Sequence, residues 1–195
     1  RQSLALAGVT LGGAENIKSY SDVYDEYKEQ GYKPVKDKNI TLHAEYTTLK
    51  SRQSLMMGAE YTASTTNGTG DNLHYAKTRL NVFGGENWTS PGTWIEYEVD
   101  AEESGLYALS FKYKQDYVVG MNVYRKLTID GELPYQELAE ISFAPKSVWK
   151  NFTVCDEKEN PYYVYLEKGT HTISLEVTLS ELADAYDRLF NIVEA

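Results

Sequence analysis

The sequence contains one cysteine, Cys155, among its 195 residues, which excludes an internal disulfide bond. It has no run of the roughly 18 to 20 apolar residues that cross a membrane as a helix, so we expect no membrane insertion by this chain. Basic residues are also few. Lys and Arg number 19 against 29 Asp and Glu, which gives a net charge of −10 and argues against a nucleic-acid partner, because phosphates need cations.

Catalytic signatures are scarce as well. Only three histidines occur, none with the HExxH spacing of a zinc site, and no serine lies in a GxSxG elbow. Glycoside hydrolysis needs two opposed carboxylates, for which Glu96, Glu98 and Glu140 are available. Glu96 and Glu98 alternate with apolar residues, as on the solvent face of a strand. We therefore expect no enzyme and keep a hydrolase as the third hypothesis.

Alternation of apolar and polar residues with period two, the pattern of half-buried strands, is frequent in this sequence. It is clearest at 93–100, 105–113 and 171–179. The charged connector AEESG between the first two predicts a hairpin turn. Shorter strand patterns lie at 40–47, 54–63, 73–83, 121–130, 132–143, 147–154 and 162–167. The residues predicted to be buried between two sheets are Ile95, Tyr97, Val99, Tyr107, Leu109, Phe111, Ile173, Leu175 and Val177.

Strand patterns with turn signals about every ten residues predict an all-β fold, an antiparallel β-sandwich. Helices are expected only at the ends. Ser19 and Asp22 resemble a capping pair and Gly31 resembles a stop signal, which predicts a helix over about 20–30. A second apolar stripe predicts a helix over 181–193. The expected organisation is a linker and helix over 1–38, a β-sandwich over 39–180 and a C-terminal helix over 181–195.

Four segments occur in a characteristic order: HAEY, GTWIEY followed by an acidic turn and GLY, LTIDG and KGTHTISLEV. Together they resemble the galactose-binding-like jelly roll, and more narrowly the non-catalytic carbohydrate-binding modules of families 6 and 35. The resemblance extends over about residues 40–179. Closely similar segments also occur as extra domains inside extracellular solute-binding lipoproteins of bacterial ABC transporters. The resemblance implies a jelly-roll sandwich that binds a glycan or oligosaccharide.

The resemblance also implies a candidate structural calcium site. The similar modules often hold calcium near their early glutamate, which corresponds to Glu45 here. Calcium takes six or more oxygen ligands, and Glu45 is the only ligand that the motif carries over. The usual module ends in a strand that carries an aspartate, whereas this chain is predicted to end in a helix. No other cofactor is expected.

A sugar site needs an aromatic ring beside amides and carboxylates, because sugars present apolar C–H faces and hydroxyls. The glycine-rich loop GGENW contains Asn87 and Trp88. Gln115, Asp116 and Tyr117 follow a predicted strand that, in a jelly roll, ends on the same side as this loop. These five residues are the predicted ligand-binding set. Two roles stay open for the tryptophan: stacking on a sugar, or anchoring the loop on the edge of the sandwich.

Arg125 is embedded in an apolar strand face. The favoured prediction for it is an ion pair with Glu140 or Glu98, and the alternative is a clamp for a ligand hydroxyl or carboxylate.

These observations predict a non-catalytic carbohydrate-binding module of an extracellular or cell-surface bacterial protein. The chain begins at Arg1, and we expect it to be a segment whose partners include the rest of a larger parent chain. The alternative is a structural or interaction domain of an ABC-transporter solute-binding lipoprotein, without a sugar site of its own. An exposed Trp88 in a cleft would favour the first hypothesis.

Overall fold

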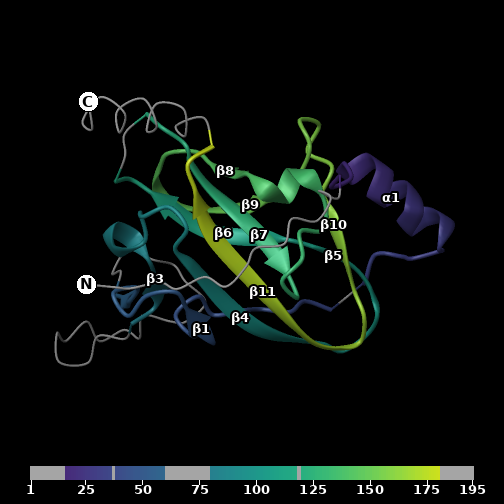
Figure 1. Cartoon of the computed structure of the whole chain (residues 1–195), viewed down its shortest axis with the longest axis horizontal. Helices are drawn as coiled ribbons and strands as arrows, with labels where there is room; N and C mark the ends of the chain where they lie inside the picture. Colours follow the sequence, from purple (N-terminus) through teal and green to yellow (C-terminus); the bar gives the residue numbers. More distant parts are fainter. Residues whose placement is uncertain (1–15, 37, 60–79, 118–119, 181–195) are drawn as a thin grey trace, which may run out of the picture.

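The computed structural model describes residues 16–36, 38–59, 80–117 and 120–180, which form an antiparallel β-sandwich with a helix at one end (Figure 1). The all-β prediction is therefore confirmed. The larger layer is a five-stranded sheet in the order β1 (Leu49–Lys50), β4 (Trp94–Ala101), β11 (Gly169–Thr178), β7 (Val123–Ile129) and β8 (Ile141–Phe143). The other layer pairs β5 (Gly105–Ala108) with β10 (Tyr163–Leu166), and β6 (Ser110–Gln115) with β9 (Lys146–Thr153).

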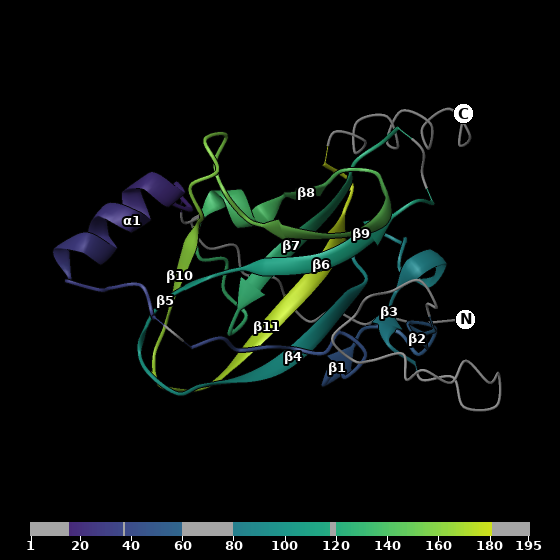
Figure 2. The same cartoon turned by 180° about the vertical axis from the view of Figure 1, so that it is seen from behind.

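The strands of the two layers cross, with β11 in front of β6 in one view and behind it in the other (Figures 1 and 2). A short pair, β2 (Met57–Gly58) and β3 (Val82–Phe83), lies at the end of the sandwich away from the helix (Figure 2).

The core lies between the layers and follows the predicted alternation. Phe143 of β8 meets three rings of the opposite layer edge-on, with ring centroids 5.1 to 5.6 Å away. The residues predicted to be buried all belong to this interior or pack against it. Ile95, Tyr97, Val99, Leu175 and Val177 are buried, and Tyr107, Leu109, Phe111 and Ile173 are partly buried.

The predicted hairpin between 93–100 and 105–113 is wrong, because these stretches belong to different layers. β4 pairs with β1 and β11, whereas β5 pairs with β10 and β6 with β9. The connector therefore crosses from one layer to the other. Both stretches have an apolar face, and both faces line the same core. The backbone of β4 finds its partner in β11, in a register that runs from Ala101 opposite Gly169 to Trp94 opposite Glu176.

Two further strand predictions need correction. The stretch 40–47 is irregular, because the Tyr46 N–H donates to the His43 carbonyl (2.9 Å) and closes a turn. In 132–143, a 3₁₀ helix, η3 (Gln136–Ala139), precedes the short strand β8. The predicted strands 54–63 and 73–83 shorten to β2 and β3 in the described part. Residues 60–63 and 73–79 of those two stretches, and the predicted helix over 181–193, lie outside the described residues.

The predicted first helix is confirmed as α1 (Tyr20–Glu29). The Ser19 side chain accepts a hydrogen bond from the Asp22 N–H (3.3 Å), and Gly31 follows the helix with a φ of 75°. Tyrosines attach this helix to β10. The ring of Tyr24 stacks near that of Tyr163, with centroids 6.2 Å apart, and α1 lies beside β10 and β5 in both views (Figures 1 and 2). Within the described part of the chain, no helix is long and apolar enough to span a membrane.

Gly105 allows the chain after α1 to lie against β5. The Val35 N–H donates to the Leu106 carbonyl and the Leu106 N–H donates to the Lys33 carbonyl, each at 3.0 Å. A Cβ atom at Gly105 would lie 2.6 Å from Cγ2 of Val35 and 3.1 Å from the Lys33 carbonyl oxygen. Valine has little rotamer freedom with which to move away.

We therefore expect Gly105→Ala to lower the free energy of unfolding by about 1 to 3 kcal/mol, as overpacked sites do. Urea unfolding measures this. Gly58→Ala is the matched control, since its new Cβ would lie 3.5 Å from Val82, an ordinary contact. Equal stability of the two variants would contradict the predicted close contact.

His171 and Asp130 join the turn after β7 to strand β11. The turn is tight, and Asp130 and Gly131 both have positive φ, 52° and 82°. The Nδ1 atom of His171 lies 2.7 Å from Asp130 Oδ2, and its Nε2 atom lies 2.8 Å from the Glu167 carbonyl oxygen. The hydrogen bond to Asp130 raises the pKa of His171. The pKa of Asp130 is lowered, because hydrogen bonds from His171 and the Thr172 N–H outweigh the effect of burial.

This contact predicts a pH-dependent stability. A raised histidine pKa gives stabilisation that is complete below the unfolded value of about 6.5 and is lost as the pH rises through the folded pKa. The lowered aspartate pKa gives stabilisation that is present above its unfolded value of about 3.9 and is lost in stronger acid. We expect Asp130→Asn to lower the melting temperature more at about pH 6 than at about pH 9. Equal losses at both pH values would show that the histidine is uncharged in the folded state.

Candidate functional site

The outer face of the five-stranded sheet carries two rows of side chains that come from three strands. Glu176 of β11 lies opposite Trp94 of β4 on one side and Lys126 of β7 on the other. In the next row, Ser174 of β11 lies between Glu96 of β4 and Thr128 of β7. Since every second residue of a strand points to the same side, the register places these side chains together on the outer face.

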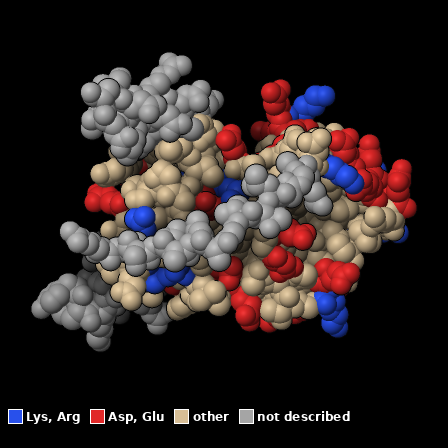
Figure 3. All heavy atoms as spheres, in the orientation of Figure 1, with Lys and Arg blue, Asp and Glu red and all other residues tan. Residues whose placement is uncertain are grey.

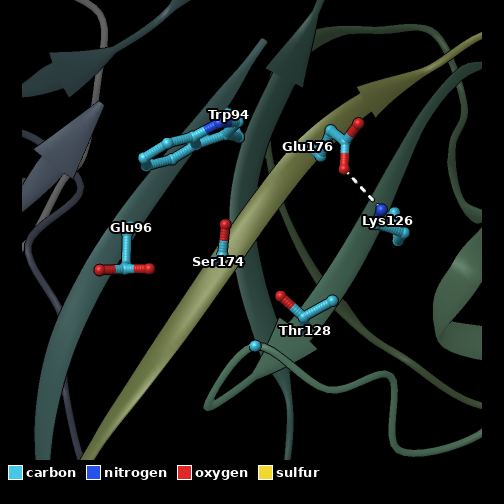
Figure 4. Close-up of a pocket in the computed structure, with 7 residues that line it drawn as sticks. Trp94, Glu96, Lys126, Thr128, Ser174 and Glu176 are labelled. Atoms are coloured by element: carbon cyan, nitrogen blue, oxygen red, sulfur yellow. Dashed lines mark ion pairs between the residues drawn. The ribbon is translucent and has the colours of Figure 1, made fainter. Parts of the chain in front are cut away.

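These two rows and Gly131 line a shallow pocket of about 230 Å³ (Figure 4). Trp94 forms one wall of it, and the Ser174 and Thr128 hydroxyls lie on its floor. The Nζ atom of Lys126 lies 2.6 Å from Glu176 Oε2, so these two charges neutralise each other across neighbouring strands. The pocket therefore combines an aromatic surface, two hydroxyls and carboxylate oxygens, which is the set of groups that a sugar ring requires.

The structure places Trp88 in a packed position. Trp88 follows the 3₁₀ helix η2 (Gly85–Asn87), and its indole N–H donates to the Thr93 carbonyl oxygen (3.3 Å). The guanidinium carbon of Arg125 lies 4.3 Å from the centroid of its ring, and Phe83 meets the ring edge-on. Trp88 is half-buried against the core. Arg125 and the protein interior therefore already contact the ring surface that a sugar would use.

The side chain of Arg125 holds Trp88 and the loop around it in this packed position. The predicted ion pair with Glu140 or Glu98 is wrong: within the described residues, Arg125 bonds to the carbonyl oxygens of Trp88 (3.0 Å) and Tyr124 (2.7 Å). Glu140 instead accepts a hydrogen bond from the Ser180 hydroxyl, at 2.8 Å. Burial lowers the pKa of Arg125 to about 10. A cation withdrawn in part from water needs compensating oxygens and rings, and the Trp88 loop supplies a carbonyl oxygen and the indole ring.

The other predicted site residues lie at the same end of the sandwich as Trp88. Gln115 is buried (8% exposed) and donates to the Met121 carbonyl oxygen at 2.9 Å, which holds the chain that leads into β7. Asp116 forms an exposed ion pair with Lys114 at 2.9 Å. Tyr117 is 65% exposed and Asn87 is exposed. The end of β6 and the η2 loop lie together in both views (Figures 1 and 2), so the predicted meeting of these two loops remains a second candidate site.

Glu45, the candidate calcium ligand, is buried with 4% of its surface exposed. The Tyr97 hydroxyl donates to the carbonyl oxygen of Ala44, the residue before Glu45, at 2.9 Å. Burial raises the pKa of Tyr97, and the Glu45 carboxylate adds to this effect. Among the residues that the structure covers, no three His, Cys, Asp or Glu side chains are grouped so as to hold a metal ion. A calcium ion here would depend mostly on carbonyl oxygens, and the calcium site stays a prediction.

Sequence reasoning did not identify the pocket, although part of the signal was present. The alternation in 93–100 places Trp94 and Glu96 on the outward side of their strand. The missing information was the partner strand, because Ser174 and Glu176 lie about eighty residues further along the chain. Trp94 can only be recognised as part of a site once the register of β4 with β11 is known.

Comparison with solved structures finds similar folds at low sequence identity. One is a cycloisomaltooligosaccharide glucanotransferase from Paenibacillus sp., with 19% identity over 82% of this chain and a TM-score of 0.46. This chain spans only 21% of that enzyme. Two others are family 35 carbohydrate-binding modules. The module from Cellvibrio japonicus has 19% identity, and the match covers 72% of this chain and 83% of that module with a TM-score of 0.44. The module from Clostridium thermocellum has 18% identity, and the match covers 64% of this chain and 77% of that module with a TM-score of 0.40.

No protein-family profile matches the sequence, and comparison with curated proteins gives no match. Two of these similar structures are modules of family 35, which is one of the two families that the sequence motifs resemble.

The packing of Trp88 predicts that it stabilises the fold. Trp88→Ala removes a half-buried ring and leaves Arg125 without its aromatic partner, so we expect the free energy of unfolding to fall by about 2 to 3 kcal/mol. Asn87→Ala is the control, and as an exposed neighbour it is expected to change stability by less than about 0.5 kcal/mol. Chemical denaturation of both variants tests this. An unchanged stability of Trp88→Ala would instead favour a ligand-binding role for the ring.

Proposed function

We propose that this chain is a non-catalytic carbohydrate-binding domain whose ligand lies in the outer-face pocket. The observation that carries the proposal is the position of Trp94. Its indole lines the open pocket, and within the described residues no other aromatic ring or cation stacks on it. A sugar can place its apolar C–H face on this ring and its hydroxyls against Ser174, Thr128 and Glu96.

The pairing of charges favours binding over hydrolysis. Glycosidases need one carboxyl group as acid and a second as base or nucleophile. In this pocket Lys126 holds Glu176 in an ion pair, so the two glutamates do not stand opposite each other as two free groups. In this proposal the domain belongs to a larger extracellular or cell-surface bacterial protein, whose remaining parts contain any catalytic activity.

The alternative function is a structural or interaction domain of an ABC-transporter solute-binding lipoprotein. That hypothesis requires no sugar site, and it leaves the shared orientation of Trp94 and the pocket hydroxyls without a role. Binding by the isolated chain therefore separates the two hypotheses.

The test combines a glycan array with variants at both candidate sites. Trp94→Ala should weaken binding of any glycan found on the array by about tenfold or more, since a stacked ring contributes about 1 kcal/mol beyond the area that it buries. The melting temperature should change little, because the ring lies on the face of the sheet opposite the core. Tyr46→Ala removes an aromatic ring that is 69% exposed outside both sites and should have no effect.

Two other outcomes would move the binding site or reject the proposed function. Loss of binding in Tyr117→Ala, with Trp94→Ala unaffected, would place the ligand at the loop end with Asn87, Gln115 and Asp116. Absence of binding to every glycan by a folded wild-type chain would reject the proposed function and favour the structural domain.

A further inference from the structure

Glu96 is the one pocket charge that is not neutralised within the described part of the chain. Of the three charged side chains that line the pocket, Lys126 and Glu176 pair with each other at 2.6 Å. The backbone carbonyl of Glu96 accepts from the Thr48 N–H (2.8 Å), whereas none of the described residues forms an ion pair with its carboxylate. Glu96 is also only partly exposed, beside Trp94 on the same strand.

The surroundings of Glu96 supply no cation from any neighbouring strand. On β11 the residue opposite it is Ser174, and on the far side the residue opposite it in β1 is Leu49. Lys50, the next residue of β1, turns to the Leu55 carbonyl oxygen at 2.6 Å. Further along the outer face of β4 come Glu98 and Asp100, both exposed. Figure 3, which views this side of the molecule, shows both acidic and basic side chains among the described residues of this face.

From this arrangement we propose that the pocket selects sugars that carry a free amine, with Glu96 accepting the ammonium group. The inference rests on the proposed function and names the class of ligand for the same site. An amino sugar combines the two properties that the pocket complements: a C–H face for Trp94 and a positive charge for Glu96. The hydroxyls of Ser174 and Thr128 remain available for the neutral part of the ring. An anionic sugar would instead meet the uncompensated carboxylate and be repelled.

The test compares two matched oligosaccharides by calorimetric titration at about pH 5.5, where glutamate is ionised and amines are protonated. One is a glucosamine tetramer with free amines, and the other is the same tetramer with every amine acetylated. The wild-type chain should bind the free-amine tetramer at least about tenfold more tightly. About 0.5 M salt should reduce this difference, because exposed charges are screened. Lysine amide, an ammonium without a sugar ring, should show no measurable binding.

Glu96→Gln tests the role of the carboxylate directly. This variant should bind both tetramers alike, with the affinity of the wild type for the acetylated one, and it should melt at the wild-type temperature. Glu98→Gln removes the next outward carboxylate of the same strand, which lies outside the pocket, and should keep the full preference. An equal loss of the preference for the free-amine tetramer in both variants would overturn the assignment to Glu96. It would indicate that the summed negative charge of this face attracts the amines.

Failure of this inference is distinguishable from failure of the proposed function. Wild-type binding to neutral glycans that depends on Trp94 but shows no preference for the free amine would overturn the amino-sugar inference alone. Tight binding of lysine amide would also overturn it, since the sugar ring would then contribute nothing. Absence of all glycan binding would reject both.

Discussion

The register between β4, β11 and β7 is the constraint on which both the interior and the pocket depend. Leu175 of β11 lies opposite Ile95 on one side and Leu127 on the other, and all three are buried. The next residue, Glu176, lies opposite Trp94 and Lys126 on the other face. A shift of one residue would exchange the two faces and place charges in the core. The burial of the apolar row therefore determines which side chains meet outside.

Local patterns in the sequence predict the local elements well. Ser19 and Gly31 mark the ends of α1, and the alternation in 171–179 predicts β11. Apart from the stretch 40–47, which forms no strand, and the 3₁₀ helix within 132–143, the errors concern which strands pair. Alternation shows that a strand has a buried face, but it does not show whether that face meets the next strand in sequence or a distant one. The predicted hairpin failed for this reason.

The candidate site also depends on strand pairing that the sequence pattern does not reveal. The glycine-rich loop leaves two roles open for Trp88, a sugar-stacking ring and a loop anchor, and in the structure its ring packs against the guanidinium group of Arg125. The sequence around Trp94 does not indicate a site, because its neighbours along the chain, Thr93 and Ile95, are buried residues. Its functional neighbours come from β11 and β7, and contacts between residues so far apart in sequence cannot be inferred from composition or spacing.

The alternation that builds this sheet also separates the side chains of the pocket from those of the core. Pocket residues and core residues occupy alternate positions of the same strands, so exchanging Glu96 or Ser174 leaves Ile95 and Leu175 in place. Substitutions in the pocket therefore need few compensating changes in the interior. Such a face can accept new side chains one at a time, whereas a change at Arg125 would disturb the loop that its guanidinium group holds.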